Sequence, residues 1–135
     1  MFDPRNLVRI DGIAGLTAGV FVLLHVGRLS NLYDLPNWLV SANGIANLAY
    51  GTYSSILASF TKRPLVSIAV LATANLIWGI VCLITAGIFF RSATVFGFAH
   101  AVFEGLFVGG LGLLEWRFRL LLCGNLQAHL GKLGD

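Results

Sequence analysis

Four long apolar runs separated by short polar breaks dominate the pattern of residues along the chain. The runs cover residues 7–29, 36–60, 64–90 and 92–116, and each is long enough to cross the hydrocarbon core as a helix, which needs about 20 residues. The breaks carry helix-start signals: Pro36 opens the second run, Pro64 opens the third and Ser92 opens the fourth. The pattern therefore predicts four membrane-spanning helices.

Short connections between these runs determine the expected architecture. Helices joined by a few residues must be antiparallel neighbours, so we expect an all-α, up-and-down four-helix transmembrane bundle in which the first and last helices are adjacent. This domain covers residues 1–119. Residues 120–135 form a cytoplasmic tail in which apolar residues alternate with polar ones. Both a helix lying on the inner membrane surface and a frayed tail fit that alternation.

Composition supports an integral membrane protein. The chain of 135 residues is 57% hydrophobic and 11% charged, and its mean hydropathy is +0.83, whereas about a quarter of the residues of a soluble domain are charged. The lipid bilayer is then the main partner, and the net charge of +3 is a topology signal that predicts no binding to nucleic acid.

The basic residues predict an orientation for the expected bundle. One side carries Arg5, Arg9, Lys62, Arg63, Arg117, Arg119 and Lys132, and the other carries only Arg28 and Arg91. By the positive-inside rule, the richer side faces the cytoplasm. With four spans, both termini would be cytoplasmic.

Polar side chains within the apolar runs suggest an interior site. At 1.5 Å per residue, His100 lies roughly 12 Å and Glu104 roughly 18 Å from the outer start of the fourth run. Polar groups in hydrocarbon turn inward to find partners. Equal depth predicts one layer of Asn47, Asn75 and Glu104, and a second layer nearer the outside of His25, Asn43 and His100.

These residues lead to a hypothesis of small-molecule binding. A mostly apolar pocket with a few convergent polar groups is the usual form of such a site, and a lipid, a quinone or another small amphipathic molecule would suit it. The predicted ligand-binding residues are Asn43, Asn47, Tyr50, Asn75, His100 and Glu104. The same side chains would equally serve as hydrogen bonds that fix helix register. Neither a serine elbow nor a phosphate-binding loop occurs, so we expect no enzyme activity.

Two alternatives for the function remain open. One is an accessory or structural subunit that packs in a larger membrane complex. The other is a haem- or metal-binding redox protein, for which His25, His100 and Glu104 are the weak ligand candidates. The estimated depths of the two histidines differ by several ångströms, so we expect no cofactor.

Small residues and terminal charges predict how the helices pack. Gly97, Gly105 and Gly109 lie on one face of the fourth run, and Gly15 and Gly19 lie on one face of the first. Such stripes let helix backbones approach closely, here the first helix against the fourth, or two copies of the chain in a homodimer.

Charged residues near the predicted cytoplasmic end, including Asp11 and Glu115, are interpreted as headgroup-level charges. Trp78 lies inside the third run and needs a partner for its indole N–H.

Four segments together resemble small, uncharacterised four-helix inner-membrane proteins of bacteria. These segments are RIDGIAGLTAGV, NLAYGTYS, ANLIWGIVCLITAG and EGLFVGGLGLLEWR, and the resemblance covers nearly the whole chain up to Arg119. It implies a four-helix fold and the bacterial cytoplasmic membrane, and it transfers no functional residue. The architecture is also loosely similar to that of DoxX-type proteins, which implies nothing about function.

Overall fold

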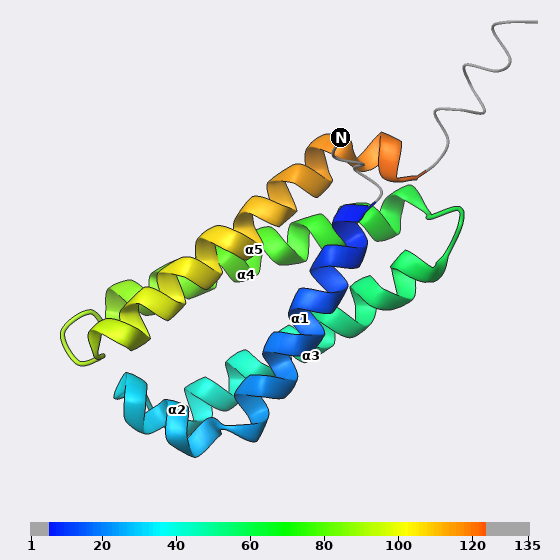
Figure 1. The fold of residues 1–135 in the computed structure, drawn as a ribbon. Helices are drawn as coiled ribbons and strands as arrows, with labels where there is room; N and C mark the ends of the chain where they lie inside the picture. The colour runs from blue at the N-terminus through cyan, green and yellow to red at the C-terminus, as the bar shows by residue number, and fades with distance from the viewer. Residues whose placement is uncertain (1–5, 124–135) are drawn as a thin grey trace, which may run out of the picture.

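Five α-helices and no strand make up the part of the chain that the structure, a computed structural model, describes: residues 6–123 (Figure 1). They are α1 (Leu7–Leu24), α2 (Val26–Tyr33), α3 (Asn37–Ser59), α4 (Leu65–Ile88) and α5 (Val95–Leu122). The predicted tail begins inside α5, and its residues 124–135 lie outside the described residues.

The prediction of a four-helix transmembrane bundle is wrong. Within residues 6–123, three helices are long and apolar enough to cross a membrane: α1, α4 and α5. The helix α3 is long enough, but amides and hydroxyls along it, among them Asn43, Asn47 and Ser54, make it less apolar than the other three. With three candidate spans instead of four, the prediction that both termini are cytoplasmic no longer follows.

The first apolar run forms two helices. It breaks at His25, whose backbone N–H bonds to the carbonyl of Val22, three residues back. The chain continues as α2 up to Asp34, which adopts the left-handed conformation (φ 53°) that Asp tolerates better than most residues. This break accounts for the fifth helix.

Helix starts follow the local signals closely, with one shift. Pro36 and Pro64 cap α3 and α4 with extended backbone. The last helix begins after Thr94 instead of Ser92, because the Thr94 hydroxyl accepts a hydrogen bond from the Gly97 N–H at 3.3 Å. Threonine is a favoured N-cap for this reason.

The long helices pack as two pairs, α1 along α3 and α4 along α5 (Figure 1). Glycines permit the close approach in both pairs. A Cβ atom on Gly15 would lie 2.8 Å from the Gly51 Cα, and one on Gly105 would lie 2.9 Å from the Gly79 carbonyl oxygen. The glycine stripes were expected to pack the first helix against the last. Gly15 instead meets α3 and Gly105 meets α4, although α1 and α5 also contact each other.

The apolar residues face outward as well as inward, as in a protein surrounded by lipid. Exposed side chains include Ile13, Leu24, Val66, Ile88 and Phe103, whereas six polar or charged residues in the described part of the chain are buried. Two apolar clusters hold the helices together. The first contains Val8, Leu57, Ile68, Leu71, Leu122 and Cys123, and the second contains Val22, Leu29 and Val40. On α1 and α3, which contribute to both clusters, the buried polar residues Asp11, Asn47 and Ser54 lie between the cluster positions.

Candidate functional site

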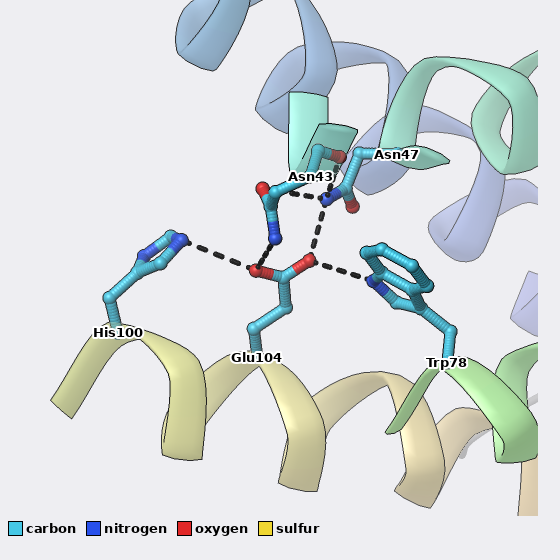
Figure 2. Close-up of polar contacts among 5 residues, drawn as sticks. All are labelled: Asn43, Asn47, Trp78, His100 and Glu104. Carbon is cyan, nitrogen blue, oxygen red and sulfur yellow. Dashed lines mark hydrogen bonds and ion pairs between the residues drawn. The ribbon is translucent and has the colours of Figure 1, made fainter. Parts of the chain in front are cut away.

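The buried carboxylate of Glu104, on α5, accepts four hydrogen-bonding contacts (Figure 2). Asn47 Nδ2 lies 2.6 Å and Trp78 Nε1 lies 3.1 Å from Oε1. Asn43 Nδ2 lies 2.6 Å and His100 Nε2 lies 3.2 Å from Oε2. The carboxylate thereby joins α3, α4 and α5.

Helical periodicity brings these partners together. Asn43 and Asn47 are one turn apart on α3, as His100 and Glu104 are on α5, and residues four apart share a face of a helix. Asn47 Nδ2 also lies 3.1 Å from the backbone oxygen of Asn43, which holds the amide in position. Figure 2 shows the two amides pointing from α3 toward Glu104.

The contacts at Glu104 define what the group can do chemically. An ionised carboxylate only accepts, and the two amides and the indole offer N–H donors to it. The imidazole differs because its Nε2 can either donate or accept. A proton at this site can therefore lie on His100 or between His100 and Glu104 while the three other contacts persist.

Helix α2 covers the histidine. The rings of Tyr33 and His100 stack with centroids 5.1 Å apart. The hydroxyl of Thr94 donates to the Leu32 carbonyl at 2.7 Å, and the Thr94 N–H donates to the Tyr33 carbonyl at 2.9 Å, so the end of α2 is fixed to the start of α5. Burial and, secondarily, the negative charge of Glu104 raise the pKa of the Tyr33 phenol, which therefore stays protonated at neutral pH.

A second polar cluster consists of Asp11, Asn75 and Glu115. Asn75 Nδ2 donates to Glu115 Oε2 at 3.0 Å. Three further oxygens, Asp11 Oδ2, Asn75 Oδ1 and Glu115 Oε1, are buried and have no hydrogen-bond partner within residues 6–123. Asp11 is 5% exposed and Glu115 is fully buried. The interpretation of these two carboxyls as headgroup-level charges is therefore wrong, because the first apolar cluster covers the ends of the helices around them.

A cavity of about 250 Å³ lies between the helices and connects the two polar clusters. Its wall is formed by Asp11, Ala14, Gly15, Ala18, Val22, Asn43, Asn47, Tyr50, Asn75, His100, Phe103, Glu104, Phe107 and Val108. A second cavity, of about 70 Å³, adjoins Trp78 and Tyr33 and shares Val22, Asn43 and His100 with the first. Apolar side chains supply most of both walls.

All six residues predicted to bind a ligand line the larger cavity: Asn43, Asn47, Tyr50, Asn75, His100 and Glu104. The predicted layers, however, are partly wrong. Asn43 bonds to Glu104 together with Asn47, whereas Asn75 bonds to Glu115. Residue count gives no information on the rotation of each helix, which decides which neighbour a side chain meets.

Two features of the site were not assigned from the sequence. The carboxyl of Asp11 lies on the cavity wall, and Trp78 supplies one of the donors to Glu104. The signal for Trp78 was an indole N–H inside an apolar run that required a partner. Asp11 gave no comparable signal, because its position near a helix end suggested contact with headgroups.

Of the three metal and haem candidates, His25 lies apart from His100 and Glu104. His25 lines neither cavity, and its Nδ1 bonds to the Phe21 carbonyl at 2.9 Å on its own helix. Among residues 6–123, no group of three or more His, Cys, Asp or Glu side chains is placed to hold a metal ion. His100 and Glu104 contact each other. This pair supplies two ligands, whereas a metal ion needs several.

Comparison of the chain with models of protein families, with curated proteins and with solved structures found no match.

Proposed function

We propose that this membrane protein is non-enzymatic and binds a small amphipathic molecule in the cavity beside Glu104. The observation that carries the proposal is the cavity of about 250 Å³, with apolar walls and polar groups that converge from several helices. Ligand sites typically combine a mostly apolar wall with a few placed polar groups.

The volume limits the size of the ligand. A dry apolar cavity of about 150 Å³ binds a benzene ring, so a cavity of about 250 Å³ has room for one ring with a short substituent. The head of a quinone or the end of a lipid chain meets this limit. The amides of Asn43 and Asn47 and the imidazole of His100 would orient a polar group of the ligand.

Filling the cavity tests the proposal. Trp78 lies beside the site, and replacing the other two tryptophans (Trp38→Phe and Trp116→Phe) makes its emission a local reporter. In lipid nanodiscs, benzyl alcohol should change this emission with saturation. Ala14→Phe places a ring at the cavity wall and should abolish the saturable change.

The matched control is Ile13→Phe on the same helix, at a position that is 64% exposed and outside the cavity wall. This variant should respond as the parent does. An equal, non-saturating response in the parent and both variants would mean that benzyl alcohol only partitions into the bilayer, and the proposal would be abandoned.

We further propose that the protein resides in the bacterial cytoplasmic membrane, with the loop that carries Lys62 and Arg63 on the cytoplasmic side. The resemblance to bacterial inner-membrane proteins and the basic residues of this loop and of the end of α5 support this placement. A Lys62→Cys variant in right-side-out cells should resist a membrane-impermeant thiol reagent and react after lysis. Labelling in intact cells would reverse the proposed orientation.

A further inference from the structure

The charged side chains around the larger cavity are of one sign. Asp11 and Glu104 lie on its wall, and Glu115 bonds to the wall residue Asn75. The residues that line the cavity include neither Lys nor Arg. A cleft lined by one sign of charge with low-dielectric walls concentrates ions of the opposite sign.

The polar cluster around Glu104 and the cluster of Asp11, Asn75 and Glu115 differ in whether their oxygens have hydrogen-bond partners. The carboxylate of Glu104 has four partners. Asp11 Oδ2, Asn75 Oδ1 and Glu115 Oε1 have none among the described residues, and the three side chains are at least 95% buried. Buried polar atoms are normally paired, and every one of these atoms is an acceptor when the carboxyls are ionised. With both carboxyls ionised, the group that completes this cluster must be a donor.

Aromatic rings occupy the same cavity wall. Tyr50, Phe103 and Phe107 all line it, and the two phenylalanine rings stack with centroids 6.1 Å apart. The faces of aromatic rings attract organic cations, most strongly where water is excluded. Carboxyl oxygens and aromatic faces in one cavity are the features that recognise an ammonium group on an apolar body.

We infer that the cavity takes a small lipophilic amine, whose ammonium group donates to Asp11 and Asn75 while its apolar body lies against the aromatic wall. This inference rests on the proposed function, because it names the class of ligand that the same cavity binds. Of the three unpartnered oxygens of the cluster, Asp11 Oδ2 and Asn75 Oδ1 belong to residues that line the cavity, and a primary ammonium has three N–H donors to offer them.

Three ligands of nearly equal shape test the inference without any substitution at the site. Benzylamine, benzyl alcohol and benzoate are titrated into the Trp78 reporter protein in nanodiscs of neutral lipid at pH 7. Benzylamine should bind about tenfold or more tightly than benzyl alcohol, a ratio that corresponds to one charge-assisted contact. Benzoate should not bind, because the carboxyls repel it.

Acid-to-amide variants locate the ammonium group. Asp11→Asn should abolish the preference for benzylamine over benzyl alcohol, so that the ratio of the two affinities falls to about one. Asp34→Asn is the matched control, because Asp34 lies outside both cavity walls and asparagine also tolerates its left-handed backbone. It should keep the preference for the amine.

The outcomes separate the inference from the proposed function. Equal, saturable binding of the amine and the alcohol by the unsubstituted reporter protein would overturn the amine inference and leave the cavity as a neutral binding site. Loss of saturable binding for all three ligands would overturn both. A preference for benzylamine that survives in Asp11→Asn would overturn the placement at Asp11. If Asp11→Asn does not fold, the ligand series on the unsubstituted reporter protein still decides the class of ligand.

Discussion

Replacing Glu104 with leucine is expected to destabilise the protein by about 3 kcal/mol or more. The change leaves the amide of Asn43 and the indole of Trp78 without an acceptor, and each stranded donor costs about 1–3 kcal/mol. It also removes the 2.6 Å contact of Asn47, which keeps only its bonds to Asn43. Unfolding in mixed micelles of SDS and a mild detergent measures the loss. Phe96→Leu, at a position of α5 that is 66% exposed, is the control and should cost much less.

The Glu104→Gln variant separates hydrogen bonding from shape. Glutamine keeps one acceptor oxygen, but its NH₂ group would face N–H donors that now bond to the second carboxylate oxygen. We therefore expect an intermediate loss, about 1–2 kcal/mol. Full stability of both the Leu and the Gln variants would mean that the carboxylate does not hold these helices together.

Gly51→Leu is the second substitution with a large expected effect. A Cβ atom at Gly51 would lie 2.2 Å from the Leu16 backbone nitrogen and 2.6 Å from the Gly15 carbonyl carbon. Backbone atoms cannot rotate away, so α1 and α3 must separate, and we expect a loss of about 3 kcal/mol, at the upper end of overpacking costs, or failure to fold.

Gly110→Leu is the matched control, because a Cβ atom at that position has no neighbour within 4 Å. Thermal unfolding and the fraction of monodisperse protein in detergent compare the two variants. Equal stability of Gly51→Leu and Gly110→Leu would contradict the close packing of α1 along α3.

The extent of the helices could be largely predicted from the sequence. Apolar runs and prolines placed the ends of α3 and α4 within a few residues, because these signals are local. The break at His25 was missed, since the apolar pattern continues through it. The polar face of α3 was recognised in the sequence. Its amides and hydroxyls, however, make α3 less apolar than the three candidate spans, so counting apolar runs gave one span too many.

Helix pairing could not be predicted in the same way. Glycines occur on several helices. A stripe of small residues indicates that the backbone of another helix packs closely against it, but it does not indicate which helix that is. Gly15 could have met α5, but it meets Gly51 of α3. Pairing depends on long-range complementarity between surfaces, which a single sequence does not display.

The candidate site was partly predictable because burying polar groups in a membrane protein is costly. This cost identified Glu104 and the amides as inward-facing, and they line one cavity. It did not identify the partner of each, so Asn75 was paired with the wrong carboxyl. Asp11 was taken for a surface charge because the apolar cluster that covers it joins residues far apart in the sequence.

A double-mutant cycle between Asn47 and Glu104 tests most directly the central claim, that Glu104 is the acceptor that assembles the interior site. The free energy of unfolding is measured for the unsubstituted protein, Asn47→Ala, Glu104→Leu and the double variant. Because Asn47 Nδ2 lies 2.6 Å from Glu104 Oε1, the double variant should cost less than the sum of the single variants by about 1–3 kcal/mol. Losses that add to within about 0.5 kcal/mol would show that the two side chains do not interact and would contradict the site described for Glu104.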